Sequence, residues 1–533
     1  VTFDTTAALT NYRLAFLNDS YTLYADDIPI LTGLLRNYTN HIGPIDPYET
    51  PRFIFFGDNT TSAQVTIQFS YAELTVATPN GDGTGPGGVG STDGTSALHL
   101  WLRADGDVFT DGGCSTAVSA NDDPVACWGD HSGYGNNAAQ GATAPLYQTG
   151  VINGQPTIQL NGTSDYFSLP DFVSGFTAGE FFVALQAAAD PPAAAAQSGA
   201  WDFGTAAATS HYPFTDGDLY DGWGSTIRRS VTPGTSLAQF NLYNSGSQSG
   251  RWTNRLNGSI LLDDTAANTV GFTSAPTLGR SNASTFLDGD IAEAILFNAV
   301  LNSAQRTILE NYASAKYDLT LASTDVYAGD TAANGDYDLN VAGIGAESDG
   351  NQTEAHASGL VLAESASSLA AGEYLLAGHR TANNGNNNVD VPGGVTQRWQ
   401  RVWYVDKTGG VDATLTFDFS EAGMDGLAGD PANYVLLYSA AQAPFSWSVL
   451  MSGATAVTID QTAFTVTNAN LNAGYYTLGT GDVVNSPTAV TLTQISSSPD
   501  NSSLMSLTLI IMLVVGGLVV FKKRLGHNPL SKQ

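Results

Sequence analysis

Short apolar runs separated by turn residues recur along most of the chain. Residues 65–69 alternate apolar and polar side chains, the period-2 pattern of a strand with one buried face. The same strict alternation appears at Val411, Ala413, Leu415, Phe417 and Phe419. Other runs, such as EFFVALQ (180–186) and AEAILFN (292–298), are mostly apolar and are bounded by Gly, Asn or Asp. The pattern predicts an all-β protein built from tandem sandwiches.

One segment has the period of a soluble helix. Ser303–Tyr317 (SAQRTILENYASAKY) follows Asn302, and either Asn302 or Ser303 can cap its first turn. Its apolar residues share one helical face, as expected where a helix packs on a sheet: Ile308, Leu309 and Tyr312. The sequence therefore predicts a single helix after a long series of strands.

A second kind of apolar run lies near the end of the sequence. Leu504 to Phe521 carries no charged residue and is followed at once by Lys522, Lys523 and Arg524. About 18 apolar residues suffice to cross a bilayer as a helix. Lys and Arg beside a span stay on the cytoplasmic side. We therefore expect one C-terminal transmembrane helix, with residues 1–503 outside a cell or outside a virion envelope.

Changes in composition divide the chain into seven parts. Residues 80–97 are rich in Gly and are expected to form a flexible linker. Gly83, Gly85 and Gly88 give a formal GxGxxG, but a dinucleotide site needs a strand before it and a helix after it. The predicted parts are an N-terminal β domain (1–79), the linker (80–97), a first sandwich (98–319), a second β-sandwich (320–480), a polar stalk (481–503), the transmembrane helix (504–521) and a cytoplasmic tail (522–533).

Charge and cysteine content agree with an exterior location. Only 13% of residues are charged, yet Lys+Arg number 19 against 50 Asp+Glu, for a net charge of −31. Such a surface disfavours nucleic acid, whose binding depends on basic residues that neutralise phosphates. The two cysteines, Cys114 and Cys127, bracket a short acidic loop, and in an exported chain this spacing predicts a disulfide.

Ordered motifs in residues 98–319 resemble laminin-G-like, concanavalin A-like domains of secreted bacterial surface proteins. The motifs are LWLRAD (100–105), WGDHSG (128–133), PTIQLNG (156–162), GDIAEAILF (289–297) and the helix ending in Lys316-Tyr317. The resemblance implies a two-sheet jelly-roll sandwich, often associated with glycan binding or adhesion. RWQRVW (398–403), followed by the alternating strand, resembles a poorly characterised companion sandwich that follows such domains.

Aromatic residues among Gly and Asp are the candidates for ligand binding. An aromatic face suits the CH surface of a sugar, and polar neighbours suit its hydroxyls. Core packing is the alternative for each of them. The candidates are Trp201, Tyr212, Tyr220, Trp223 and Trp252.

Acidic pairs on turns are the candidates for calcium, which prefers six to eight oxygen ligands. The pairs chosen are Asp122 with Asp123 and Asp288 with Asp290, although Asp-Gly is also an ordinary turn dipeptide. Asp288-Gly-Asp290-Ile-Ala-Glu293 also has the spacing of the catalytic strand of concanavalin-like glucanases, which place two carboxylates close together. It begins with the shorter Asp and lies in a closing strand, so a structural role is preferred and no enzyme activity is expected.

Three functional classes remain open. The first is a membrane-anchored surface protein for non-catalytic recognition or adhesion, with surface glycans as partners. The second is a structural subunit of a surface layer, sheath, filament or viral spike that packs against copies of itself. The third, a glycan hydrolase, lacks a convincing carboxylate pair.

Overall fold

The computed structural model describes residues 12–17, 20–25, 28–34 and 83–482. The last range has short gaps at 192–197, 207–209, 267, 282–284, 366–368, 381–383, 425, 428, 443 and 459. Strands dominate these residues, so the prediction of an all-β protein is confirmed. The first three strands form an antiparallel sheet: β1 (Tyr12–Leu17), β2 (Ser20–Ala25) and β3 (Ile28–Leu34).

The predicted membrane segment, residues 504–521, lies outside the described residues, as do the stalk beyond 482 and the tail. Among the residues that are described, no helix is both long enough and apolar enough to span a bilayer. The C-terminal span therefore stays a prediction of the sequence.

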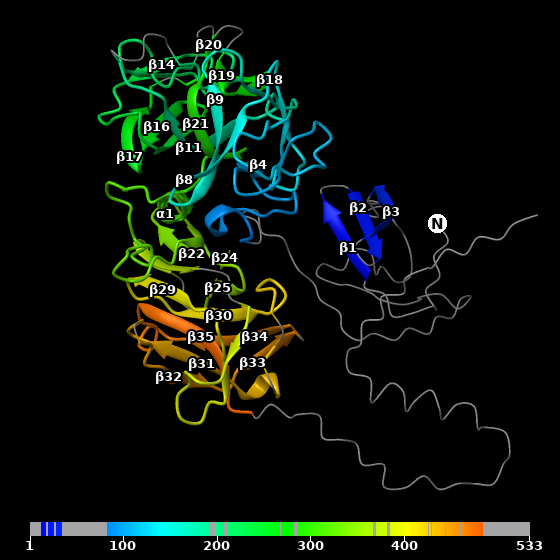
Figure 1. The fold of residues 1–533 in the computed structure, drawn as a ribbon, viewed down its shortest axis with the longest axis vertical. Helices are drawn as coiled ribbons and strands as arrows, with labels where there is room; N and C mark the ends of the chain where they lie inside the picture. The colour runs from blue at the N-terminus through cyan, green and yellow to red at the C-terminus, as the bar shows by residue number, and fades with distance from the viewer. Residues whose placement is uncertain are drawn as a thin grey trace, which may run out of the picture. The chain divides into compact units, whose positions relative to one another are not determined.

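The first sandwich consists of two sheets with an apolar core between them (Figure 1). One sheet has the order β17 (Ser259–Asp264), β16 (Arg251–Leu256), β15 (Asn241–Gln248), β11 (Ala178–Ala187), β21 (Asp288–Phe297), β9 (Gln155–Asn161) and β8 (Leu146–Ile152), with β4 (Leu98–Arg103) also paired to β21. The other has the order β12 (Trp201–Gly204), β18 (Phe272–Leu278), β10 (Phe167–Ser168), β7 (Ala138–Gln140), β6 (Cys127–Trp128) and β5 (Val108–Phe109). Two small hairpins complete it: β13 (Leu219–Asp221) with β14 (Arg229–Val231), and β19 (Arg280–Ser281) with β20 (Thr285–Phe286).

Both faces of the larger sheet are covered, which explains the mostly apolar run in β11. Phe181 and Val183 face the core between the two sheets. Phe182 and Ala184 face the opposite way, into a second cluster that includes the helix α1 (Ser303–Tyr317). Because successive side chains of a strand point to opposite faces, a strand buried on both sides is apolar at nearly every position.

The helix forms over the predicted residues but lies in a more enclosed place than expected. Asn302 accepts a hydrogen bond from the backbone of Gln305 in a capping box, as the sequence indicated. The predicted apolar face is buried, and so are polar residues such as Arg306 and Lys316. The reason is that α1 packs between the first sandwich and β22 of the second (Figure 1).

The second sandwich also has two sheets and its own core. The larger has the order β23 (Gly350–Gln352), β22 (Leu339–Glu347), β26 (Glu373–His379), β29 (Trp403–Thr408), β35 (Gly474–Thr480), β28 (Gln397–Trp399) and β27 (Asn386–Asn387), with β31 (Tyr434–Ser439) on β35 and β32 (Ser448–Ser452) on β31. The smaller has the order β24 (Glu354–His356), β25 (Leu360–Glu364), β30 (Ala413–Asp418), β34 (Gln461–Val466) and β33 (Thr455–Thr458). The alternating residues of β30 and its flanks face this core, as predicted. A short 3-10 turn, η2 (Pro431–Asn433), precedes β31.

The Gly-rich segment is not the flexible linker that the composition predicted, within its described part. Residues 83, 85–91 and 96 are buried, and 86–88 form the short helix η1 (Pro86–Gly88). The carbonyl of Gly88 accepts a hydrogen bond from Gln352, and that of Gly83 accepts one from the backbone of His356. Glycine is needed here for close packing: a Cβ on Gly88 would lie 2.3 Å from the Cβ of Ala355.

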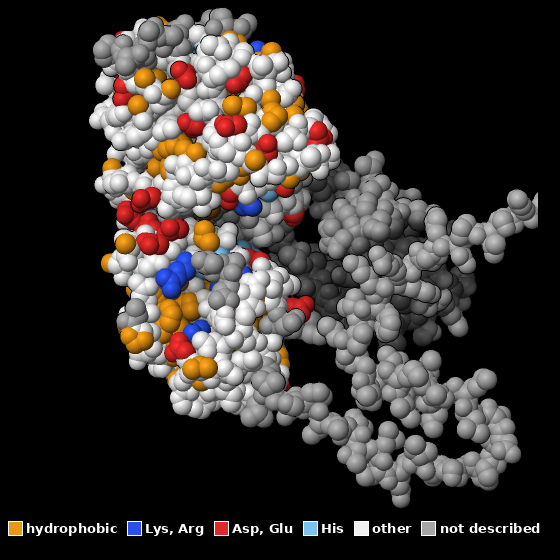
Figure 2. Space-filling view, in the orientation of Figure 1, with side chains coloured by type: hydrophobic (Ala, Val, Ile, Leu, Met, Phe, Trp, Pro, Cys, Tyr) orange, Lys and Arg blue, Asp and Glu red, His pale blue; other side chains and the backbone are white. Residues whose placement is uncertain are grey.

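On the face shown in Figure 2, acidic side chains are more frequent than basic ones, and several of them gather at the left of the view. This agrees with the strong acidic excess of the sequence.

Candidate functional site

Four of the five aromatic residues predicted to bind sugars lie in the core instead. Trp201, Tyr212, Trp223 and Trp252 are at most 2% exposed. Their polar neighbours supply buried hydrogen bonds, such as the one that Trp201 Nε1 donates to Asp221 at 3.1 Å. A buried ring cannot stack on a sugar, so this prediction is wrong for these four. The Gly and Asp around them mark turns, which the sequence pattern could not separate from exposed loops.

The fifth aromatic residue, Tyr220, is half-buried and its ring is already occupied. Its hydroxyl donates to Asp216 at 2.8 Å, and the Arg228 guanidinium lies 4.5 Å from the ring centroid. Phe214 contacts the ring edge-on, with centroids 4.9 Å apart. The described contacts therefore leave Tyr220 little free face.

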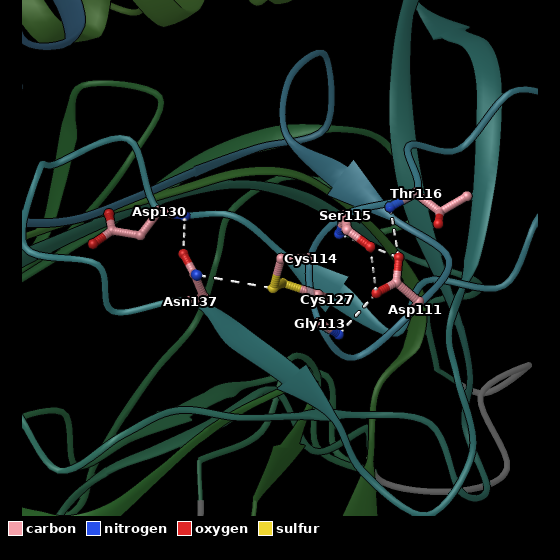
Figure 3. Close-up of a disulfide and its surroundings, with 8 residues drawn as sticks. All are labelled: Asp111, Gly113, Cys114, Ser115, Thr116, Cys127, Asp130 and Asn137. Carbon is pink, nitrogen blue, oxygen red and sulfur yellow. Dashed lines mark hydrogen bonds between the residues drawn. A yellow bond between two sulfur atoms is a disulfide. The ribbon is translucent and has the colours of Figure 1, made fainter.

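The predicted disulfide between Cys114 and Cys127 is present, with Cα atoms 5.4 Å apart. Figure 3 shows the bridge beside Asp111, whose carboxylate accepts hydrogen bonds from the loop. The backbone N–H of Thr116 donates to Asp111 at 2.6 Å, and that of Gly113 at 2.9 Å. The hydrogen bonds from Thr116 and Ser115 lower the pKa of Asp111 to about 2. The loop is therefore held by the disulfide and by the Asp111 carboxylate, which accepts hydrogen bonds from its backbone N–H groups.

Asp122 and Asp123, proposed from the sequence as calcium ligands, bind protein donors. Asp123 accepts from the backbone N–H groups of Ser119 and Ala120 at 2.7 and 2.8 Å, and these bonds lower its pKa. Asp122 accepts from the Gln148 amide at 2.8 Å. No group of three or more His, Cys, Asp or Glu side chains is placed to hold a metal within the described ranges. Calcium therefore stays a prediction.

The other proposed metal pair, Asp288 and Asp290, is also not arranged as a site. Asp288 is exposed, whereas Asp290 is buried and accepts hydrogen bonds from Gln186 at 2.8 Å and Thr157 at 3.3 Å. Burial raises the pKa of Asp290. The two carboxylates thus have different surroundings on the same strand, although their spacing in sequence suggested a shared ligand.

Glu293, the third carboxylate of that strand, lies at the centre of a buried cluster. We call this the glutamate cluster; its members are Glu293, Trp101, Tyr312, Lys316 and Tyr317. One carboxylate oxygen accepts from Trp101 Nε1 and from the Tyr312 hydroxyl at 2.9 Å. The other accepts from Lys316 Nζ at 3.0 Å and the Tyr317 hydroxyl at 2.6 Å. Three of the five motifs that carried the family resemblance thus meet at one carboxylate: LWLRAD, GDIAEAILF and the helix ending in Lys316-Tyr317.

Lys316 is held in its charged form in the glutamate cluster. Burial opposes the charge on Lys316, but Glu293 and neighbouring groups raise its pKa well above the usual value. Asp105 accepts a second bond from Lys316 at 3.0 Å. Because four donors bind the Glu293 carboxylate, none of its lone pairs is left for a substrate. Three of these donors belong to α1, so the carboxylate holds the helix against the sheet.

The best candidate for a binding site is a polar cavity of about 280 Å³ beside the start of α1. We call it the arginine pocket. One wall is the outer face of β15 and β16, another is the first turn of α1, and the turn between β22 and β23 adds a third. Its lining residues are Gly246, Gln248, Arg251, Thr253, Arg255, Val300, Leu301, Asn302, Ser303, Arg306 and Asp349.

Two of the three arginines in this pocket form close ion pairs. Arg251 binds Asp263 through two hydrogen bonds of 2.8 and 2.9 Å. Arg306 binds the fully buried Glu180 at 2.7 and 3.0 Å. Burial opposes the charge on Glu180, yet Arg306 holds its pKa below the usual range. These ion pairs hold the side chains of Arg251 and Arg306 in place in the lining of the pocket.

The sequence analysis missed this pocket, although part of its signal was visible. In RWTNR (251–255) two arginines and a threonine occupy alternate positions, so a strand would place them on one face. Arg306 follows the helix cap by one turn. Nothing in the sequence indicates that this strand face and this helix end meet.

The comparisons with known proteins give a match to one family and remote likenesses to solved structures. A family model described as "Domain of unknown function (DUF8202)" matches residues 305–475, a span from α1 to β35. The helix is therefore matched together with the second sandwich. No curated protein matches the chain.

The similar solved structures include a domain of an arabinanase, a sialidase and an arabinofuranosidase, all at low scores. Domain 4 of AbnA, a GH43 extracellular arabinanase from Geobacillus stearothermophilus in complex with arabinotriose, is 14% identical, with a TM-score of 0.29 over 40% of this chain and 97% of that chain. Trypanosoma rangeli sialidase is 14% identical, with a TM-score of 0.28 over 43% of this chain and 34% of that chain. A mutant GH54 α-L-arabinofuranosidase is 13% identical, with a TM-score of 0.27 over 45% and 59%. Similarity at this level assigns no activity.

Proposed function

We propose that this chain is a surface protein that recognises glycans without cleaving them. The observation that carries the proposal is the arginine pocket, whose lining offers guanidinium, amide, hydroxyl and carboxylate groups. Such groups match sugar hydroxyls, which both donate and accept hydrogen bonds. The described aromatic candidates are buried or covered, so recognition rests on polar contacts rather than on stacking.

The carboxylates of β21 support recognition over hydrolysis. Glycosidases need two carboxylates that flank the bond to be cleaved. Glu293 is saturated by four donors inside the protein, and Asp290 is held by Gln186 and Thr157. We therefore propose that this strand has no catalytic role.

The proposed location follows from the sequence and is supported by the disulfide. Disulfides persist in oxidising, exterior compartments. The apolar segment 504–521 would anchor the chain in a cell membrane or virion envelope, with the glycan-binding part outside. A concanavalin A-like jelly roll for residues 98–319 belongs to the same proposal.

A structural role in a surface layer, sheath, filament or spike is the second candidate, and the sheet edges favour it. Within the part of the chain that the structure describes, β17 ends one sheet of the first sandwich, and β32 pairs only with β31 in the second. Each edge carries an exposed apolar residue, Ile260 at 57% and Val449 at 43%. An unpaired strand edge can pair with another chain, so copies of this protein could associate there.

Two measurements on the full-length protein separate these candidates. A glycan array combined with product analysis should show binding without release of sugar. The pocket variant Gln248→Ala should weaken that binding, whereas the exposed Asp288→Asn should not. Release of sugar would overturn the non-catalytic assignment. A regular lattice in images of native membranes, with no array binding, would favour the structural candidate instead.

A further inference from the structure

Positive charge is scarce in this protein, and three arginines meet in the arginine pocket. The whole chain has 19 Lys+Arg against 50 Asp+Glu. Arg251, Arg255 and Arg306 nonetheless line one cavity of about 280 Å³. A site that gathers the rarest charge of the chain is suited to a ligand of opposite sign.

Arg255 is the member of the pocket with unused bonding capacity. It is 8% exposed, and its guanidinium donates to two neutral oxygens, the Asn244 amide at 3.2 Å and the Thr253 hydroxyl at 3.4 Å. Among the described residues it has no ion pair at hydrogen-bond distance, unlike Arg251 and Arg306. Burial and the neighbouring Arg306 lower the pKa of Arg255.

The acidic groups near Arg255 are already engaged. Glu180 is bound by Arg306, and Asp263 by Arg251. Glu310 accepts a hydrogen bond from the Thr324 hydroxyl at 2.6 Å, and burial raises its pKa. An anion entering the pocket would therefore meet a guanidinium that no nearby carboxylate neutralises directly.

The opposite wall of the pocket is built for hydroxyl groups rather than for charge. Asp349 accepts from the backbone N–H of Ser303 at 3.1 Å and from its hydroxyl at 2.9 Å, so the start of α1 offsets its charge. On the strand wall that carries Arg255, Gln248 of β15 and Thr253 of β16 add an amide and a hydroxyl. A bare phosphate or sulfate would use the arginines but would find no partners for this second wall.

We infer that the arginine pocket binds the carboxylate-bearing sugar of an acidic glycan, a uronate, with its carboxylate on Arg255 and its hydroxyls toward Asp349 and Gln248. A planar guanidinium pairs well with a planar carboxylate. The cavity volume suits one sugar residue rather than a long oligosaccharide. This inference rests on the proposed glycan recognition and names its ligand class.

The test compares D-galacturonate with D-galactose, two sugars that differ in the carboxylate, by isothermal titration of the full-length protein. Inorganic phosphate is the third probe. Galacturonate should bind at least tenfold more tightly than either galactose or phosphate. Arg255→Gln should abolish that preference. Arg280→Gln, which changes an arginine outside the pocket, should retain it.

A second variant guards against misfolding of Arg255→Gln. Arg251 has a side chain that is 45% exposed, so Arg251→Ala should fold and should reduce galacturonate binding several-fold without affecting galactose. Circular dichroism melts of each variant show whether the fold is intact.

The outcomes separate this inference from the proposed function. Equal binding of galactose and galacturonate, or array binding restricted to neutral glycans, overturns the uronate and leaves glycan recognition intact. Phosphate binding as tight as galacturonate, or galacturonate binding unchanged in both arginine variants, also overturns it. Failure of every sugar and every array glycan to bind overturns the proposed function itself.

Discussion

Two buried charge clusters lie at opposite ends of α1, and they differ in how fully their hydrogen bonds are used. In the glutamate cluster one carboxylate takes four donors, and the gap beside Glu293, Ala313 and Tyr317 has no room for a water molecule. In the arginine pocket Arg255 faces a cavity and donates only to neutral oxygens. A saturated cluster stabilises the fold, whereas an unsaturated guanidinium beside a cavity retains capacity for a ligand.

The largest effect is expected at the saturated cluster. Glu293→Gln leaves the Lys316 ammonium buried without its main partner, which should lower the free energy of unfolding by about 3–5 kcal/mol. Chemical denaturation of the full-length protein measures this. Asp288→Asn, on the same strand but exposed, should change it by about 0.5 kcal/mol or less. A loss at Glu293 no larger than at Asp288 would contradict the structural role of the cluster.

The disulfide loop is a third charged site and should have the next largest effect. The double variant Cys114→Ser, Cys127→Ser removes the bridge between two residues 13 positions apart. Chain entropy predicts that the free energy of unfolding falls by roughly 3 kcal/mol, which chemical denaturation measures.

The same loop tests the calcium prediction. Because Asp123 already accepts hydrogen bonds from two backbone N–H groups, millimolar Ca²⁺ should leave the melting temperature unchanged. A rise in melting temperature that chelator reverses would instead support the calcium site predicted from the sequence.

The Gly-rich segment covers the middle of α1, between the two clusters. A Cβ at Gly87 would approach Tyr312 and Ile308, and one at Gly88 would meet Ala355. Gly88→Ala should lower the free energy of unfolding by about 2 kcal/mol more than Gly150→Ala does. Both glycines have positive φ, at +86° and +64°, but Gly150 has open space around it. Thermal unfolding of the two variants separates the cost of packing from that of backbone strain. Equal losses would show that the segment does not pack closely against Ala355 of β24.

Arg255→Gln should lower the free energy of unfolding by only about 1 kcal/mol. Water in the pocket can solvate the Asn244 amide and the Thr253 hydroxyl, which lose their donor. Glu180 keeps its partner Arg306 in this variant. Denaturation curves alongside those of Glu293→Gln test the comparison directly. Equal losses would mean that the arginine pocket is as closed a structural cluster as the glutamate cluster.

The last comparison concerns pH and two histidines of the second sandwich. Burial opposes the charge on His356, but Glu354 and Glu421 raise its pKa to about 10. Its stabilisation is therefore complete below pH 6.5, the usual value for histidine, and is lost as the pH rises toward 10. His356→Gln should flatten the stability profile in that range.

His379 is the matched control. Burial lowers its pKa to about 4, so it destabilises the fold as the pH falls from 6.5 toward 4. His379→Asn should change only that acidic range. Unfolding curves from pH 4 to 10 measure both, and an unaltered alkaline slope in His356→Gln would contradict the assignment.

The sequence by itself determined the local features. The period-2 alternation of Val411–Phe419 gave a strand whose apolar side faces a core, because side-chain direction in a strand follows from backbone geometry alone. The helix Ser303–Tyr317, its Asn302 cap and the disulfide were likewise predictable, since each depends on neighbouring residues or on a short loop. The membrane segment 504–521 remains a statement of the sequence.

The tertiary structure decided which polar and aromatic residues are free to function. Trp201 lies in β12 and Trp223 in the turn after β13, yet both side chains are part of the core. Glu293 and Lys316 meet because β21 and α1 pack together, and Arg255 meets the first turn of α1 for the same reason. These contacts join residues far apart in the chain. Local sequence patterns could not predict these contacts, because the contacts depend on how the two sandwiches pack around the helix.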